Sequence, residues 1–183
     1  MFTKNRSSPA ASQSSAKERA VVVQGVVSEL LFDLLKAKKV KEVVVLEGRP
    51  SLEAARANCR ALMKRKIKPV LIADNMAGFL FFKNRVKEVW LAYYRVDKKG
   101  ALCDIGASIL GVLAKQHQLP INLFPAAKKP KSVGKEKDLF SFNGERVAPS
   151  NIKGYVPLTE RLAGKYITHV YVPQCNCGSA TCK

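Results

Sequence analysis

Residues 43–77 read VVVLEGRPSLEAARANCRALMKRKIKPVLIADNMA and predict a complete βαβ unit. The apolar runs 43–46 and 69–73 are short and rich in β-branched residues, as expected for parallel strands that are buried on both faces. Between them, apolar side chains recur at helical spacing, at Leu52, Ala55, Cys59, Leu62 and Met63. The stretch therefore predicts two neighbouring parallel strands that are joined by one helix.

Polar residues follow both predicted strands, at Glu47 to Arg49 and at Asp74 and Asn75. A right-handed crossover brings the carboxyl ends of both strands to the same edge of the sheet. Open α/β folds bind ligands at that edge. We therefore expect the functional site there.

Strands and helices alternate along the rest of the chain. Apolar runs predict further strands at 20–24, 88–93, 120–124 and 166–172, and helical periodicity predicts helices at 27–38, 76–83 and 103–117. Residues 94–101 are expected to form a polar turn, and residues 126–157 form a long Lys-rich excursion without a period. The pattern predicts an α/β fold: a single domain at 20–173, with a doubly wound, mostly parallel sheet of about six strands and helices on both faces.

The two ends differ in composition from this domain. Residues 1–19 are basic, Ser-rich and poor in large apolar groups, which predicts a disordered tail, with a transit peptide as the alternative. Residues 174–183 carry Cys175, Cys177 and Cys182. Structural zinc takes four ligands, and this spacing supplies three. A reduced, mobile tail is expected, a zinc or redox site is the alternative, and no cofactor is predicted.

The chain holds 32 Lys and Arg against 14 Asp and Glu, a net charge of +18. Such a charge attracts phosphates, nucleic acid and anionic surfaces. The basic residues are scattered over predicted helices and one loop, and RNA-binding signatures are missing, so a nucleic-acid footprint and a solvated surface both stay open. No apolar run reaches the roughly 18–20 residues that a bilayer requires. With five cysteines and no signal peptide, we expect a cytoplasmic protein without a membrane partner.

Five motifs, in this order and spacing, resemble a known family over residues 21–172. They are Gln24-Gly25, Glu47-Gly48-Arg49-Pro50 with Ala55-Arg56, Asp74-Asn75-Met76-Ala77, Gly106 to Lys115 before Pro120, and Glu145-Arg146-Val147-Ala148-Pro149. The chain resembles the C-terminal Rossmann-like domain of the regulatory subunits of initiation factor 2B and of methylthioribose-1-phosphate isomerases. The resemblance implies a dimerising domain whose enzyme members isomerise a phosphorylated pentose.

The resemblance also implies a catalytic cysteine and a catalytic aspartate, and neither is present at its expected position. The cysteine position falls near Gln24 or Gly25, and the aspartate position falls at Tyr94. A displaced carboxylate at Asp97 or Asp104 is the lesser alternative. The helical domain that precedes this fold in the family is not expected here. Proton transfer beside a carbonyl requires an acid and a base in a site that excludes water, so we predict no catalytic residues.

The ligand-binding residues that the resemblance implies are Gly25, Arg49, Arg56, Asp74, Asn75 and Glu160. An arginine suits a phosphate through two parallel hydrogen bonds. The alternative for Arg49 is an ion pair with Glu47 or Asp74. For Asp74 we favour the cap of the helix that begins at Met76.

We therefore expect an initiation-factor-2B-like domain, a homodimer without catalytic activity, that binds a phosphorylated sugar or nucleotide or a protein partner. A divergent sugar-phosphate isomerase is the first alternative. An RNA- or ribosome-associated basic protein is the second.

Overall fold

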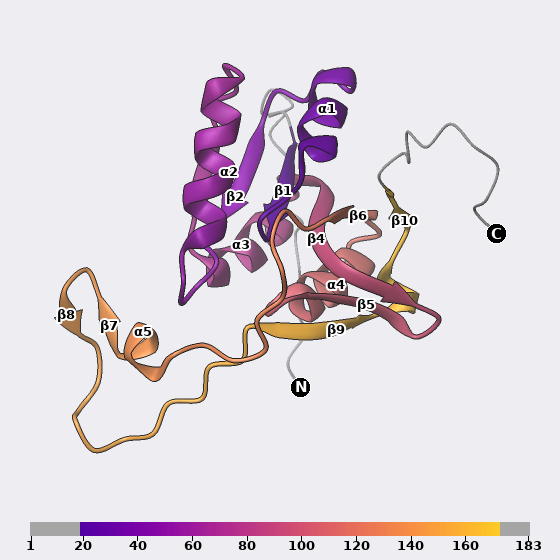
Figure 1. The fold of residues 1–183 in the computed structure, drawn as a ribbon. Coiled ribbons are helices and arrows are strands. Elements are labelled where there is room, and N and C mark those ends of the chain that lie inside the picture. Colours follow the sequence, from indigo (N-terminus) through magenta and orange to yellow (C-terminus); the bar gives the residue numbers. More distant parts are fainter. Residues whose placement is uncertain (1–18, 173–183) are drawn as a thin grey trace, which may run out of the picture.

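The computed structural model describes residues 19–172, which form one mixed sheet with helices on both faces (Figure 1). The strands of the parallel part are β1 (Ala20–Gln24), β2 (Val43–Leu46), β3 (Val70–Ile72), β4 (Val86–Asp97), β6 (Ile121–Pro125) and β10 (His169–Val170). The longer helices are α1 (Glu29–Ala37), α2 (Glu53–Lys64), α3 (Ala77–Phe82) and α4 (Ala107–Gln116). Short 3-10 helices follow β3 at η1 (Asp74–Met76) and β9 at η2 (Gly164–Tyr166).

The parallel strands lie in the order β10-β6-β4-β1-β2-β3. The chain thus winds outward from β1 in one direction through β2 and β3, and then in the other through β4 and β6. This is the doubly wound arrangement predicted from the sequence. Its switch point lies between β1 and β4, because β1 is followed by α1 on one face, whereas the next helix after β4, which is α4, lies on the other face.

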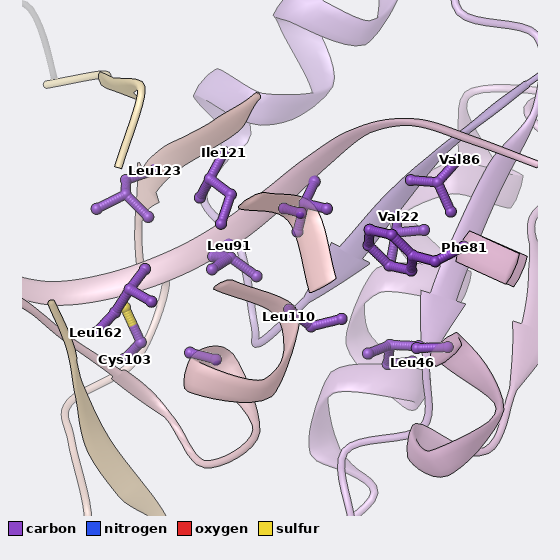
Figure 2. Close-up of a cluster of buried hydrophobic side chains, with 14 of the residues drawn as sticks. Val22, Leu46, Phe81, Val86, Leu91, Cys103, Leu110, Ile121, Leu123 and Leu162 are labelled. Carbon is purple, nitrogen blue, oxygen red and sulfur yellow. The ribbon is translucent and has the colours of Figure 1, made fainter. Parts of the chain in front are cut away.

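Two separate cores follow from this arrangement. On one face α1 and α2 cover the sheet through Leu31, Leu35 and Leu62. On the other face α3 and α4 cover it, and Figure 2 shows Phe81 and Leu110 beside strand residues such as Val22. All six of these side chains are at most 2% exposed. Helices thus cover both faces of the sheet, which accounts for the near-continuous apolar strands in the sequence.

The sheet also contains two antiparallel strands that the sequence did not indicate. β4 runs on to Asp97 and turns back into β5 (Gly100–Asp104), which pairs with β9 (Thr159–Ala163). The predicted polar turn at 94–101 and the predicted helix start at Cys103 are therefore wrong. Gly100, at φ +140°, allows β9 to approach β5 closely, because a Cβ there would lie 2.0 Å from the carbonyl oxygen of Leu162.

Two further predictions are corrected. The buried face of α2 consists of Ala54, Ala55, Asn58 and Leu62, whereas Met63 is 66% exposed. The last strand is reduced to two residues of β10. The excursion at 126–157 contains α5 (Glu136–Phe140) and a hairpin of β7 (Ser141–Phe142) and β8 (Glu145–Arg146), and it projects beside the loop that leads into α2 (Figure 1).

Candidate functional site

A cavity of about 250 Å³ lies at the carboxyl ends of β1 and β2, next to the switch point of the sheet. The sheet and the start of α2 form one side, and the first part of the excursion forms the other. The polar and charged lining residues are Gln24, Arg49, Ser51, Glu53, Tyr94, Asp104, Lys128, Lys131, Lys135 and Asp138. The cavity occupies the edge where the sequence predicted a ligand site.

The floor of the cavity is the turn that follows β1. Gln24 is 5% exposed, and its Nε2 donates a 2.8 Å hydrogen bond to the carbonyl oxygen of Ile105. Gly25 has φ +81°, and a Cβ there would lie 2.6 Å from the Cβ of Ala92 and 2.9 Å from Oδ2 of Asp104. Only glycine therefore fits between the turn and the Asp104 carboxyl group.

A buried amide on α2 holds this turn in place. Asn58 is 1% exposed; its Nδ2 donates a 2.7 Å hydrogen bond to the carbonyl oxygen of Gly25, and its Oδ1 accepts one from the backbone N–H of Val27 at 3.4 Å. Buried backbone groups are costly when they lack a partner. Asn58 is thus a positioning residue that the helical pattern of apolar residues did not reveal.

A tyrosine and an aspartate meet beside this turn. The hydroxyl group of Tyr94 donates a 2.5 Å hydrogen bond to Oδ1 of Asp104. Burial raises the pKa of Asp104, and the hydrogen bond from Tyr94 and the charge of Lys128 lower it in part. Burial and the bond to Asp104 raise the pKa of Tyr94 well above its usual range. The pair therefore offers the cavity a neutral phenol and a carboxyl group that holds its proton more tightly than usual.

The loop after β2 is fixed by Asp74, whose carboxylate accepts hydrogen bonds from the backbone N–H groups of Gly48 at 3.0 Å and Arg49 at 2.8 Å. Asp74 makes no capping bond to the helix that follows it, so the predicted capping role is wrong. Among residues 19–172, Arg49 has no ion pair; its guanidinium lies 4.5 Å from the ring centroid of Phe142 in β7. Burial, and then the charge of Asp74, raise the pKa of the neighbouring Glu47.

The opposite wall carries lysines from the excursion. Lys128 Nζ donates a 2.7 Å hydrogen bond to Oε2 of Glu53, and Lys131 Nζ lies 3.6 Å from Oε1 of the same carboxylate. The hydrogen bond from Lys128 lowers the pKa of Glu53. Glu53 therefore stays ionised and holds both ammonium groups at the rim of the cavity.

The structure brings together only part of the predicted ligand-binding set. Gly25 and Arg49 line the cavity, and Asp74 supports it from behind. Arg56 and Asn75 are exposed and do not line it. Glu160 instead accepts a 2.9 Å hydrogen bond from the backbone N–H of Ser108 at the start of α4.

The site also contains Asp104, which the sequence offered only as the lesser alternative, and two lysines that the sequence did not select. Asp104 reaches the cavity because β5 is a strand, so its carboxyl group lies beside Tyr94 rather than on a helix. Asp97 does not, because its carboxylate binds Arg161 at 2.7 Å. Lys128 and Lys131 belong to a segment without periodicity, and their only signal was the cluster of lysines itself.

The described part of the chain also bears on metal binding, thiol chemistry and membrane insertion. Residues 19–172 contain no group of three or more side chains suited to a metal ion, and Cys175, Cys177 and Cys182 lie outside them. Burial raises the pKa of Cys103 to about 12, so this thiol stays protonated at neutral pH. Over the same residues, no helix is both long and apolar enough to cross a membrane.

Comparisons with known proteins match this chain to one protein family. A model of the Initiation factor 2 subunit family matches residues 10–172. A methylthioribose-1-phosphate isomerase of Fervidobacterium nodosum is 33% identical over 132 residues, which are 66% of this chain and 37% of that protein. The corresponding enzyme of Syntrophus aciditrophicus is 29% identical over 73% of this chain and 40% of its own length. The chain thus spans about two fifths of these relatives.

Solved structures show the same fold. The subunit delta of translation initiation factor eIF-2B from A. fulgidus superposes with a TM-score of 0.73 at 22% identity, over 84% of this chain and 52% of that one. The 5-methylthioribose 1-phosphate isomerase of Pyrococcus horikoshii gives a TM-score of 0.72 at 22% identity, over 85% and 50% of the two chains. At these identities the likeness is one of fold alone.

Proposed function

Because this chain belongs to the Initiation factor 2 subunit family, we propose that it binds a small phosphorylated sugar or nucleotide in the cavity beside β1 and β2. One observation carries the proposal. Four cations line a cavity of about 250 Å³, Arg49 on the sheet side and Lys128, Lys131 and Lys135 on the excursion side. A phosphate between these walls would meet a guanidinium fork and ammonium groups, the donors that bind phosphate most strongly.

The remaining lining suits the sugar part of such a ligand. Tyr94, Asp104 and Gln24 supply donors and acceptors for hydroxyl groups, and Pro50, Ile105 and Leu158 supply apolar surface. Small-molecule sites typically combine an apolar lining with a few placed polar groups. The volume is below the roughly 300–1,000 Å³ of sites for drug-sized ligands, which favours a pentose phosphate over a larger cofactor.

We propose binding without catalysis as the main function. The positions that the resemblance assigns to a thiol and a carboxylate hold Gln24 and Gly25 on one side and Tyr94 on the other. Of the described cysteines, Cys59 and Cys103, neither lines the cavity. Proton transfer between neighbouring carbons requires two groups that exchange protons with the substrate, and Asp104 is the one carboxyl group held against the floor.

Asp104 favours a second candidate, a divergent sugar-phosphate isomerase. Its carboxyl group lies in the cavity, and burial raises its pKa toward the range that suits an acid–base catalyst. The two candidates differ in turnover. An NMR assay of a pentose phosphate with the purified chain would show a second isomer if the enzyme candidate holds, and Asp104→Asn would abolish that signal.

A thermal-shift assay with ribose 5-phosphate, AMP and inorganic phosphate tests the binding proposal. A ligand at a hundredfold excess over its Kd stabilises the native state by about 2.7 kcal/mol, which raises Tm. Arg49→Ala should lose the shift. Arg56→Ala is the matched control, because it removes an exposed arginine that does not line the cavity, and its shift should equal that of the native chain. Equal shifts in both variants, or no shift in the native chain, would refute the proposal.

Pairing of two copies is a further part of the proposal. β3 is the edge strand, and Val70 and Leu71 on it are 48% and 53% exposed; Phe79 on α3, the helix that follows β3 along the chain, is 61% exposed. A second copy that pairs its own β3 antiparallel to this strand would extend the sheet and cover these side chains around a twofold axis. Light scattering should then give twice the chain mass, and Leu71→Lys should give a monomer. A native monomer would contradict this pairing.

A further inference from the structure

The sheet edge opposite the cavity carries a set of basic segments, which we call the amino edge. It consists of Arg19 and segments 36–42, 64–68 and 83–88, which together hold twelve Lys and Arg and two acidic residues, Glu42 and Glu88. These segments lie before β1, β2, β3 and β4. The sequence scatters these charges over seventy positions, but the parallel topology brings them to one place.

The strand register fixes this arrangement. Val21 is paired with Val43, Val44 with Val70 and Ala20 with Val86, so the starts of the four strands lie side by side in the order β3-β2-β1-β4. Each strand is preceded within two residues by a cation: Lys68, Lys41, Arg19 and Arg85. Neighbouring strands are about 4.8 Å apart, so the cations follow one another across the edge of the sheet.

Most of this charge is available to a partner. Lys38 is paired with Glu88, Arg85 with Glu42 and Arg65 with Glu29. Within residues 19–172, seven further exposed lysines of these turns make no ion pair with an acidic side chain: Lys36, Lys39, Lys64, Lys66, Lys68, Lys83 and Lys87. These seven lysines without an acidic ion-pair partner indicate that the surface binds a polyanion.

We propose that the amino edge binds the phosphate backbone of a nucleic acid, independently of the cavity. The tips of the three turns, which have positive φ, are Lys39, Lys66 and Asn84. These residues are polar, whereas a membrane-binding surface presents apolar side chains that enter the lipid. A row of lysines matches a chain of regularly spaced phosphates and reads no base sequence.

Fluorescence anisotropy with a labelled 20-nucleotide single-stranded RNA tests the proposal on the full chain. Affinity falls with salt, and each neutralised phosphate makes the plot of log K against log salt steeper by about 0.7 for a single strand. The variant Lys39→Gln/Lys68→Gln/Lys87→Gln removes one charge from each turn. It should bind the RNA about tenfold more weakly at 50 mM salt, and its plot of log K against log salt should be less steep by about 2.

The matched control is Lys98→Gln/Lys137→Gln/Lys153→Gln, which removes three exposed lysines outside the amino edge and the cavity. It should keep nearly the native affinity and slope. Equal losses in both variants would show that net charge alone attracts RNA, and would overturn the proposal. Tighter binding of phosphatidylserine vesicles than of RNA, lost in the amino-edge variant alone, would also overturn it and assign the surface to lipid.

Discussion

The Tyr94 hydroxyl group donates a 2.5 Å hydrogen bond to the carboxyl group of Asp104, and both side chains line the same cavity. Tyr94 holds the position at which the resemblance implies an aspartate. The hairpin of β4 and β5 returns a carboxyl group to that point from ten residues further along the chain. A carboxyl group therefore lies at this wall, and β5 carries it rather than β4.

Asp104→Asn should stabilise the protein at neutral pH, because the raised pKa of Asp104 means that its ionised form is disfavoured in the folded state. The native state then binds a proton more tightly than the unfolded state, so stability falls as pH rises from the unfolded pKa, about 3.9, through the higher folded value. The amide oxygen of asparagine still accepts the bond from Tyr94. Urea unfolding should give Asp104→Asn a higher free energy of unfolding than the native chain at pH 7.5, and a smaller increase at pH 4.

Asp97→Asn is the control, because it should lower stability at neutral pH where Asp104→Asn raises it. The hydrogen bond from Arg161 lowers the pKa of Asp97. The ionised carboxylate therefore stabilises the folded state at neutral pH, and this stabilisation is lost as pH falls through the pKa of the folded state. The pair is exposed, so its effect should be small. A gain for Asp97→Asn at pH 7.5, or a loss for Asp104→Asn, would contradict these assignments.

Asn58→Ala should destabilise the protein by about 2–4 kcal/mol, because it leaves the carbonyl oxygen of Gly25 and the N–H of Val27 buried without partners. Cys59→Ala is the control, since the neighbouring thiol is partly exposed and makes no such bonds. It should cost less than about 1.5 kcal/mol. Urea unfolding measures both, and equal costs would show that Asn58 only fills space.

The sequence was sufficient for the parallel part of the fold because each parallel strand leaves two signals, a short apolar run and a helix before the next run. Val43 to Leu46 and α2 show both signals. The edge that carries the site could also be predicted, because parallel strands bring the turns at their carboxyl ends to the same edge of the sheet. Arg49 was found in this way, whereas Gly25 was named only by the family resemblance.

The antiparallel strands and several site residues left weaker signals. β5 contains Cys103 and Ala101 on its buried side, too short an alternation to distinguish from the first turn of a helix. Asn58 occupies a core position of α2 that periodicity assigns to apolar residues. The amino edge was missed because its charges are dispersed in sequence and meet only through strand register.

Asp74→Ala should cost about 2–4 kcal/mol, because two backbone N–H groups, those of Gly48 and Arg49, lose a charged acceptor. The loop that carries Arg49 should then be less ordered, and the thermal shift with ribose 5-phosphate should decrease. Asn75→Ala, at an exposed neighbour, should change stability by less than about 0.5 kcal/mol and leave the shift intact. A normal ligand shift in Asp74→Ala would contradict this prediction, because binding would then not depend on the order of the loop.

Glu53→Gln should strengthen the binding of inorganic phosphate. In the free protein, Glu53 holds the ammonium groups of Lys128 and Lys131, so a phosphate at the rim competes with this carboxylate for both of them. A partly exposed ion pair contributes up to about 1 kcal/mol, so its removal should raise the affinity by about fivefold. Isothermal titration calorimetry at constant ionic strength measures the change, with Glu136→Gln as a control of equal charge outside the cavity. An affinity that falls in Glu53→Gln would instead show that Glu53 positions the lysines for the ligand.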